Sequence, residues 1–527
     1  MAVEQVLIGG QWREANHDGT FHADNPALKQ PLPAQYPVST WADVDEALAA
    51  AAVAFQEMRQ MAVEKLGLFL NRFADLLDEN KQALCELANQ ESGLPVSPRL
   101  LDVEMPRTIN QLRLAAAAAV EGSWRMATID SKAGIRSYYA GIGPVAVFGP
   151  NNFPLAFSGA AGGDFAAAIA AGNPVIVKAN PAQPGTTREL TKLAFQAVQD
   201  CGLPPAAVQL IYHMPNEDGL KFVADPRLGA IGFTGSKGAG LKLKEAADKV
   251  GKPIYLELSS INPVVILPGA LAERGEALAT EFQTSCLMAA GQFCTNPGLV
   301  ILLDDDKSAK FVDTVKAGFA GAPSGTLLGK GVEANLTQNL KLLIDAGADV
   351  EASGSGEGSS QGYTCPNTLL STSAEKFLAN PEAFQTEAFG NSSLIVKAAN
   401  LNEVCAVIDS LEGNLTGTIY SDTAGSDDPA YDLVALHLRV KVGRLIDDKM
   451  PTGVAVSAAM NHGGPFPATG HPGFTAVGIP ASIHRFAMLQ SFDNVRPSRL
   501  PRELQNENPT GSTWRLVDGA WTTESLA

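Results

Sequence analysis

The sequence predicts an α/β protein with doubly wound parallel sheets, and three observations support that prediction. Short apolar segments rich in β-branched residues recur, too brief for helices, at 143–149, 173–179, 208–213, 228–235 and 253–258. Helical stretches such as 184–200 and 236–249 separate these segments. The alternation resumes after residue 262, which indicates a second α/β domain. Buried strands that alternate with helices form parallel sheets covered on both faces.

The predicted elements follow a simple order along the chain. Residues 1–40 are rich in Gly, Pro, Asn and His, which favours short strands and turns, and residues 41–123 have helical periodicity. The second series comprises strands at 262–268 and 298–304 and helices at 271–289 and 306–319. The Gly/Ser-rich segment 353–361 is expected to be an exposed loop. Residues from about 497 onward are polar and contain proline, and they carry no structural prediction.

Composition excludes several classes of protein. The 527 residues are 45% hydrophobic and 18% charged, which is typical of a globular protein, and the length favours two or three domains. The net charge of −17 argues against nucleic acid and anionic membranes as partners. We find no secretory signal and no stretch long and apolar enough to span a membrane. Six cysteines without a CxxC pair argue against a disulfide framework, so a cytoplasmic protein is expected.

A glycine-rich turn at residues 232–240 (GFTGSKGAG) is the first candidate for ligand binding. An apolar strand runs into a helix that begins near Ser236, and Gly235 and Gly240 stand five residues apart. Glycine lets a phosphate approach the backbone, and a helix N-terminus offers free N–H groups. The spacing is not GxGxxG, and such a turn alone is more often a plain junction between two elements.

Cys294 and Glu257 are candidates for covalent and acid–base chemistry. Cys294 lies in GQFCTNPG, where Gly291 and Pro297 break the pattern and place it on a turn. A turn can direct a sulfur into a cleft, although a lone cysteine is usually an inert packing residue. Glu257 ends the apolar strand YLEL, and a carboxylate in such surroundings suits a general base. The alternative is a strand-end glutamate that faces solvent.

Two further segments carry polar side chains next to predicted strands. Residues 148–157 (FGPNNFPLAF) form a proline-flanked turn, from which the side-chain amide of Asn152 could donate to an oxyanion. Residues 386–390 (TEAFG) place Glu387 two positions before Phe389, ahead of a strand. Taken alone, each segment is typical of an ordinary turn or loop-to-strand junction.

The order and approximate spacing of these segments resemble the NAD(P)-dependent aldehyde dehydrogenases, from about residue 5 to about residue 490. The matching segments are Asn152-Phe153-Pro154, Gly235 to Gly240, Leu256-Glu257-Leu258, Gly291-Gln292-Phe293-Cys294 and Glu387-Ala388-Phe389-Gly390. The resemblance implies an aldehyde-dehydrogenase-like α/β fold. It would have a Rossmann-type cofactor domain, an α/β catalytic domain and a small β oligomerisation element.

The resemblance also implies domain boundaries and an assembly. Residues 1–125 and 144–257 would form the NAD(P)-binding domain, and residues 258–480 the catalytic domain. The oligomerisation element would comprise 126–143 and 481–495, and its pairing with a neighbouring subunit would make a homodimer or homotetramer. Residues 496–527 would be a C-terminal tail that caps the subunit interface or is mobile.

The same resemblance implies a role for each site residue. Cys294 would be the nucleophile, Asn152 an oxyanion donor and Glu257 the base that activates water. The residues expected to bind the cofactor are Lys178, Pro181, Gly235, Ser236, Gly240, Glu387 and Phe389. The residues expected to line the substrate tunnel are Phe157, Phe293, Thr295 and His462. For His462, a loop histidine that bonds locally is an equal alternative. The seven histidines include no HExxH and no paired Cys/His spacing, so no metal site is expected.

Departures from the common family pattern indicate which branch of the family the sequence resembles. Asn151 stands where a Trp usually precedes the catalytic Asn, and Ser259-Ser260 replace a usual Gly pair. No carboxylate closely follows Lys178 to repel a 2′-phosphate, so NADP is the expected cofactor and NAD is possible. Segments such as 178–187 and 460–469 are similar to the α-ketoglutarate semialdehyde (2,5-dioxovalerate) dehydrogenase branch. The neighbouring branch contains NADP-preferring fatty aldehyde dehydrogenases.

Oxidation of a small-molecule aldehyde, α-ketoglutarate semialdehyde, is the expected activity, and several alternatives to it stay open. They are oxidation of fatty or aliphatic aldehydes, a CoA-acylating dehydrogenase, a non-catalytic structural member and a cofactor-independent cysteine hydrolase. Glu257 argues against CoA acylation, because a thiol acceptor needs no base to activate water. Retention of Cys294, Glu257 and Asn152 argues against a structural member. The sequence shows no evident histidine partner for Cys294, which argues against the hydrolase.

Overall fold

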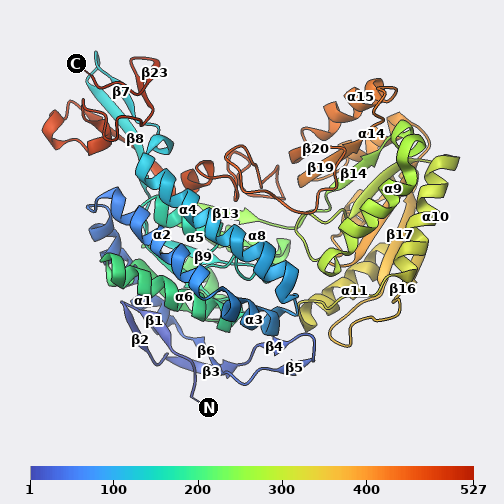
Figure 1. The fold of residues 1–527 in the computed structure, drawn as a ribbon, viewed down its shortest axis with the longest axis horizontal. Helices are drawn as coiled ribbons and strands as arrows, with labels where there is room; N and C mark the ends of the chain where they lie inside the picture. Colours follow the sequence, from blue (N-terminus) through green and yellow to red (C-terminus); the bar gives the residue numbers. More distant parts are fainter. Residues whose placement is uncertain (1, 527) are drawn as a thin grey trace.

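The computed structural model describes residues 2–526, and its N-terminal half is built around a seven-stranded sheet (Figure 1). The sheet has the order β13–β12–β9–β10–β11–β1–β2. Its strands are β1 (Val6–Ile8), β2 (Gln11–Arg13), β9 (Val145–Phe148), β10 (Val175–Lys178), β11 (Val208–Ile211), β12 (Ala230–Thr234) and β13 (Ile254–Glu257). Strands β9 to β13 are parallel, and β1 and β2 extend the β11 edge in antiparallel fashion. The five strands expected between residues 143 and 258 are therefore confirmed.

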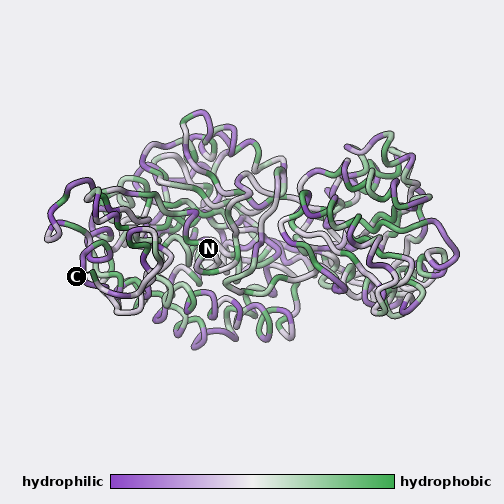
Figure 2. Tube along the Cα trace, turned by 90° about the horizontal axis from the view of Figure 1, so that it is seen from above, coloured by the Kyte–Doolittle hydropathy of each residue, from purple (hydrophilic) through white to green (hydrophobic). Residues whose placement is uncertain are grey.

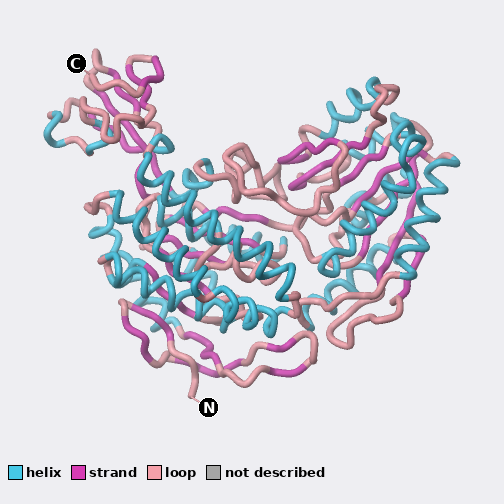
Figure 3. Tube along the Cα trace, viewed as in Figure 1, coloured by secondary structure: helices cyan, strands magenta, loops and turns pink. Residues whose placement is uncertain are grey.

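Helices enclose this first sheet, as Figure 3 shows. They are α1 (Trp41–Met58), α2 (Val63–Glu79), α3 (Lys81–Ser92), α4 (Met105–Glu121), α5 (Gly163–Ala170), α6 (Pro184–Cys201), α7 (Asn216–Val223) and α8 (Lys237–Asp248). A π-helical segment, Val96–Glu104, precedes α4. The central strands are buried on both faces and belong to one apolar core with these helices, which explains their continuous apolar sequence.

The strand order places a crevice at the carboxyl edge of the first sheet. The chain runs from β9 outward to β10 and β11, and then returns to the opposite side of β9 to form β12 and β13. The connections after β9 and β12 therefore leave in opposite directions, although the two strands are neighbours. Ligands of open α/β sheets bind at such a reversal point. Asn152 follows β9 and Gly235 follows β12, so both residues lie at this point.

The second half contains another seven-stranded sheet, in the order β16–β17–β18–β15–β14–β19–β20. Its strands are β14 (Pro263–Ile266), β15 (Leu299–Leu303), β16 (Asp349–Gly354), β17 (Asn367–Ser373), β18 (Ser392–Ala398), β19 (Asn414–Tyr420) and β20 (Val442–Asp447). Its main helices are α9 (Pro268–Leu287), α10 (Asp306–Gly321), α11 (Lys330–Asp345), α14 (Leu401–Asp409) and α15 (Asp428–Leu438). Val264 and Val265 belong to different apolar clusters, so both faces of this sheet are covered.

A third sheet lies at the upper left of Figure 1, far from the second sheet. Its order is β21–β8–β7–β22–β23. The strands are β7 (Thr128–Asp130), β8 (Ile135–Gly141), β21 (Ala487–Asp493), β22 (Arg515–Val517) and β23 (Ala520–Thr522). Residues 496–527 were expected to be a separate tail, but β22 pairs directly with β7. The fully buried Arg515 donates to backbone carbonyls within 505–524, an anchor that a polar sequence does not reveal.

The N-terminal forty residues form short strand pairs, as expected. Strand β3 (His17–Phe21) pairs with β6 (Tyr36–Ser39), and β4 (Asp24–Asn25) pairs with β5 (Gln30–Pro31). Hydrophobic and hydrophilic residues mix over short distances along the trace (Figure 2). Within residues 2–526, no helix combines the length and the apolar character that crossing a membrane requires.

Candidate active site

Cys294 lies on a tight turn at the amino edge of the second sheet, just before β15. Residues 289–291 all have positive φ, and a side chain at Gly291 would collide with the Gly390 carbonyl, so the turn requires glycine there. The buried Asn262 holds the turn by donating from Nδ2 to the carbonyls of Cys294 and Asn296, each at 2.9 Å. Sequence analysis gave no indication of this role for Asn262.

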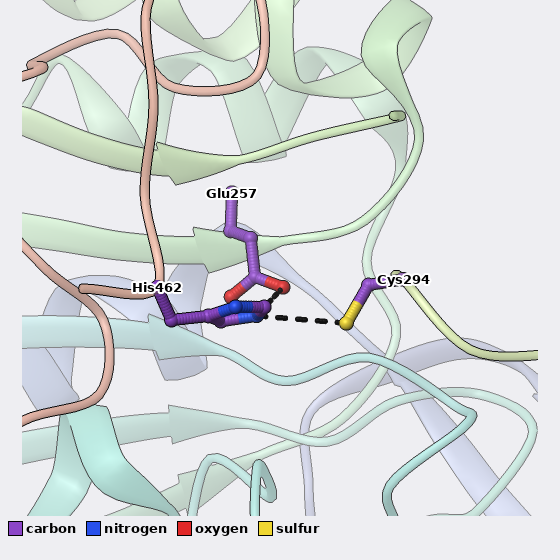
Figure 4. A group of neighbouring side chains, drawn as sticks. All are labelled: Glu257, Cys294 and His462. Carbon is purple, nitrogen blue, oxygen red and sulfur yellow. Dashed lines mark hydrogen bonds and ion pairs between the residues drawn. The ribbon is translucent and has the colours of Figure 1, made fainter. Parts of the chain in front are cut away.

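Glu257, Cys294 and His462 point toward one another (Figure 4). Glu257 is the last residue of β13, and its Oε1 accepts a hydrogen bond of 2.8 Å from His462 Nε2. The same Nε2 lies 3.5 Å from Cys294 Sγ. Glu257 and His462 are buried, with 4% and 1% of their surface exposed. A single imidazole nitrogen therefore stands between the carboxylate and the thiol.

The irregular segment that carries His462 is attached to the first sheet. Leu258 N donates to Ala468 O at 2.9 Å, and Glu257 forms an isolated bridge with Thr469. His462 N also donates to Thr475 Oγ1 at 2.8 Å, which fixes the backbone of the histidine. Sequence analysis found no histidine partner for Cys294, and the structure corrects that expectation. His462 contacts both reacting groups, so it is not merely a loop histidine with local bonds.

Electrostatics keep the resting thiol protonated. Burial, together with the negative charge of Glu257, raises the pKa of the Cys294 thiol well above its usual value. The Arg107 guanidinium acts in the opposite sense and lowers the pKa of this thiol. Because the thiolate is the nucleophilic form, Cys294 could act as a nucleophile only with a proton acceptor nearby. The Glu257 carboxylate, which His462 links to the thiol, could be that acceptor.

Asn152 is buried on the turn that follows β9, and a buried ion pair holds this turn. Asn152 Nδ2 donates to Gln292 O at 3.1 Å, next to the Cys294 turn. Glu104 Oε1 accepts from the N–H groups of residues 155 and 156, and its Oε2 pairs with Arg99 Nη1 at 2.5 Å. Arg99 Nη2 in turn donates to Asn152 O at 3.1 Å. Neither Arg99 nor Glu104 was identified from the sequence.

A cavity of about 260 Å³ opens on one side of Cys294. Its lining includes Asn152, Gly235, Ser236, Glu257, Cys294, Glu387 and Phe389. Ser236 is the residue that precedes α8, so the N-terminus of this helix faces the cavity. Gly240 is buried farther along α8, where a side chain would collide with Leu258. That glycine permits close packing of α8 on β13.

The remaining residues expected at a cofactor site lie around the same crevice. Lys178 ends β10, and burial lowers the pKa of its ammonium to about 8. Pro181 is exposed in the turn after β10. Glu387 Oε1 accepts from Ser260 N at 3.3 Å, and burial raises the pKa of this carboxyl. A helix N-terminus, a cation and a carboxylate along one crevice fit the pyrophosphate and two riboses of a dinucleotide.

Aromatic rings occupy the other side of Cys294. Phe153 lies 5.2 Å from Phe157 and 5.5 Å from Phe293, measured between ring centroids, and the His462 ring lies 5.9 Å from Phe157. Thr295 is buried, and its Oγ1 accepts from Gly453 N at 3.0 Å. Each residue expected in the substrate tunnel therefore lies beside the reactive cluster or in the turn that carries Cys294.

Two arginines stack on these rings, and the sequence gave no signal for either. Arg99 Cζ lies 4.4 Å from the Phe153 centroid, and Arg107 Cζ lies 5.1 Å from the Phe157 centroid. The ligand-type atoms of Glu257, Cys294 and His462 lie within 4.8 Å of one another, although no metal site was expected. The hydrogen bonds within the cluster account for this proximity.

Comparison with known proteins agrees with this geometry. The model of the Aldehyde dehydrogenase family matches residues 12–430. The chain is 39% identical to alpha-ketoglutaric semialdehyde dehydrogenase 2 of Azospirillum brasilense, over 98% of both chains. It is 35% identical to alpha-ketoglutaric semialdehyde dehydrogenase of Acinetobacter baylyi, again over 98% of both.

Solved structures share the fold. Aldehyde dehydrogenase C of Pseudomonas syringae, complexed with NAD+ and octanal, superposes with a TM-score of 0.80 at 21% identity, covering 94% of this chain and 98% of that chain. PnpE in complex with nicotinamide adenine dinucleotide also has a TM-score of 0.80, at 22% identity, covering 96% of this chain and all of that chain. With a family match over most of its length and two full-length relatives above 30% identity, the chain belongs to the aldehyde dehydrogenase family.

Proposed function

We propose that this aldehyde dehydrogenase oxidises α-ketoglutarate semialdehyde to α-ketoglutarate, with NADP or NAD as the acceptor. The observation that carries the proposal is the full-length similarity, at 39% and 35% identity, to two enzymes named for that substrate. The cluster of Cys294, Glu257 and His462 supports it, because the reaction needs a nucleophile, a base and a proton path in one place.

In the first half of the reaction, Cys294 attacks the aldehyde carbon. Its proton passes to the Glu257 carboxylate, either directly or by a relay in which His462 Nε2 gives its own proton to Glu257 and takes that of the thiol. The oxyanion of the thiohemiacetal accepts hydrogen bonds from the Asn152 amide and from the Cys294 N–H. That N–H has no acceptor among the described residues. Each such donor contributes about 3–4 kcal/mol in comparable sites.

A nicotinamide cofactor, when bound, would supply the hydride acceptor, and loss of hydride from the thiohemiacetal carbon would leave Cys294 as a thioester. In the second half, Glu257 removes a proton from the water that hydrolyses this thioester. Its Oε2 is buried and finds no hydrogen-bond partner within residues 2–526, so this oxygen is free to take a water. Ser236 and neighbouring N–H groups would hold the pyrophosphate, Lys178 the adenosine ribose or its 2′-phosphate, and Glu387 the nicotinamide ribose.

A neutral aliphatic aldehyde is the second candidate substrate. The observation that favours it is the group of three rings, Phe153, Phe157 and Phe293, beside Cys294. Such rings bury hydrocarbon readily, whereas a 2-oxo acid needs cations or donors as well. Glu257 argues against CoA acylation here as well, because its position beside Cys294 suits hydrolysis of the thioester by water.

The proposal extends to assembly and location. We infer a homodimer or homotetramer in which the third sheet pairs with a neighbouring subunit; β21 lies at one edge of that sheet and exposes Met488 and Leu489. We infer a cytoplasmic location from the six cysteines, all of which are free thiols.

The test follows reduced-nicotinamide absorbance with α-ketoglutarate semialdehyde and with hexanal, each with NADP and with NAD. A Cys294→Ala variant serves as the matched control. We expect a higher kcat/KM for the oxo-acid aldehyde, and no turnover in the variant. A preference for hexanal would overturn the proposed substrate. Turnover that survives in Cys294→Ala would overturn the covalent mechanism.

A further inference from the structure

Arg107 is a cation beside the reactive cluster that lacks a counter-charge. It lies in the first turn of α4, and its Nη1 donates to Val454 O at 2.8 Å. Its Nε and Nη2 are buried, and neither has a hydrogen-bond partner among the described residues. Arg99, on the neighbouring turn, differs because Glu104 pairs with its guanidinium at 2.5 Å. Among residues 2–526 no carboxylate forms an ion pair with Arg107.

The two free nitrogens of Arg107 form one edge of the guanidinium. The Nε–H bond and one N–H bond of Nη2 point in parallel from the same side of the planar group. That edge matches the two oxygens of a carboxylate, which it binds in a bidentate manner. The opposite side of the group is held by the carbonyl of Val454, so the free edge has a fixed direction.

Two contacts and one electrostatic effect place this edge near the reacting atoms. The Arg107 guanidinium stacks 5.1 Å from the Phe157 ring, which also neighbours the His462 ring at 5.9 Å. The segment that Arg107 contacts through Val454 also contacts Thr295, next to Cys294, through Gly453 N. The charge of Arg107 is close enough to lower the pKa of the Cys294 thiol.

A second arginine holds the same segment from the other side. Arg444 leaves β20, and its Nη2 donates to the carbonyls of Pro451 and Gly453, both at 3.1 Å. Its Nε is also buried without a partner among the described residues. Segment 451–454 therefore accepts hydrogen bonds from two guanidinium groups for which residues 2–526 supply no ion-paired carboxylate, in a chain whose net charge is −17.

A buried cation with unused donors is unfavourable unless a ligand completes it. We infer that the Nε/Nη2 edge of Arg107 binds the distal carboxylate of the aldehyde substrate and thereby selects aldehydes that are also acids. The inference rests on the proposed function, since that substrate is the semialdehyde of a dicarboxylic acid. Phe157 packs against the carbon chain between the two ends, and Arg444 adds positive charge to the same side.

The experiment compares three aldehydes of equal length: 2,5-dioxopentanoate, 5-oxopentanoate and pentanal. Wild type, Arg107→Met and Arg107→Lys are assayed with saturating cofactor. In Arg107→Met we expect kcat/KM for both acids to fall about 100-fold, mainly through KM, and that for pentanal to change less than fivefold. Arg107→Lys keeps the positive charge but loses the two parallel N–H donors. We therefore expect its kcat/KM for the two acids to fall about tenfold. Activity on pentanal reports that the variants are folded.

The outcomes separate this inference from the proposed function. Equal losses on all three aldehydes would assign Arg107 a role in folding or in Cys294 reactivity and overturn the inference. Unchanged kinetics on all three would also overturn it. A wild type that prefers 5-oxopentanoate and rejects the 2-oxo compound would overturn only the proposed substrate, while a selective loss on 5-oxopentanoate in Arg107→Met would still support the carboxylate site.

Discussion

The two sides of Cys294 are built in different ways. The side toward α8 is an open cavity of about 260 Å³, whose lining includes the polar residues Ser236, Asn339 and Glu387. The side toward α4 is filled by phenylalanines on which two guanidinium groups stack. The first is a crevice for a large ligand that enters and leaves. With the function proposed above, the second would discriminate among small ligands.

This difference suits two separate tasks: binding of the cofactor on one side and selection of the aldehyde on the other. A helix N-terminus and a crevice at a reversal point suit any dinucleotide of one class. By contrast, a carboxylate-shaped edge among aromatic rings suits only a few aldehydes. Cys294, Glu257 and His462 lie between the two sides, so changes there affect both.

Glu257→Gln is the change with the largest expected effect in this comparison. The amide cannot accept the proton of water, so steady-state turnover is expected to fall about 10²–10⁴-fold. Cys294 remains, so a first burst of reduced nicotinamide, up to one equivalent per subunit, is expected before turnover stalls, and the burst should be slower than in wild type because Glu257 no longer accepts the thiol proton. Stopped-flow absorbance measures both phases.

The exposed Glu245, which pairs with Lys249 on α8, provides a matched control as Glu245→Gln. That variant is expected to behave as wild type. Steady-state turnover of Glu257→Gln within a factor of three of wild type would refute the assignment of Glu257 as the base for hydrolysis.

Lys178→Met tests the cofactor side alone and has a smaller expected effect. Loss of the ammonium removes one charge-assisted contact to a 2′-phosphate, so kcat/KM for NADP should fall about tenfold or more. The value for NAD should stay within twofold. Because burial lowers the pKa of Lys178 to about 8, the ratio of wild-type kcat/KM for NADP to that for NAD should also fall as pH rises from 7 to 9.

The control for this charge is Lys249→Met, which removes an exposed ammonium at the far end of α8. The ratio of kcat/KM for NADP to kcat/KM for NAD in this variant should match that of wild type. If Lys178→Met lowers kcat/KM for both cofactors equally, then Lys178 stabilises the structure at the edge of the sheet and does not recognise the 2′-phosphate.

Much of the fold and half of the site could be predicted from the sequence, because those parts depend on local patterns. The parallel strands ended within a few residues of their predicted bounds, since apolar runs and glycine turns are local signals. Cys294 was named as a candidate because it lies on a turn and Glu257 because it ends an apolar strand, and their roles were expected from the resemblance. The strands β22 and β23 were not predicted, because the buried Arg515 that anchors them satisfies carbonyls instead of filling an apolar core.

The features of the site that were not predicted, including the contacts of His462 with Cys294 and Glu257, depend on residues from distant segments. His462 meets Glu257 across 205 residues and Cys294 across 168 residues. Arg107 stands in MPRTIN, which looks like an ordinary helix start, and its contact with Val454 spans 347 residues. No local sequence pattern predicts that the start of α4 in the first domain packs beside a loop near the C-terminal end of the second domain. Only the meeting of the two sheet edges brings these residues together.

The smallest expected effect is a shift in the pH dependence of Cys294 alkylation, which compares the charges on the two sides directly. Iodoacetamide reacts with the thiolate, so its rate rises as pH approaches the raised pKa of Cys294. Glu257 raises that pKa, so Glu257→Gln should move the curve to lower pH. Arg107 lowers it, so Arg107→Met should move the curve to higher pH, each by less than about half a pH unit, which keeps the loss of thiolate in Arg107→Met within about threefold.

Mass spectrometry of the Cys294 peptide separates this reaction from the buried Cys286, whose thiol pKa burial raises to about 12. Opposite shifts would show that the thiol responds to a cation on the aldehyde side and to a carboxylate at the hydrolytic position. Shifts in the same direction would mean that both variants act by loosening the burial of Cys294, because increased solvation lowers a thiol pKa whatever charge was removed. The two sides of Cys294 would then differ in shape, and the alkylation data would give no evidence that their charges act on the thiol.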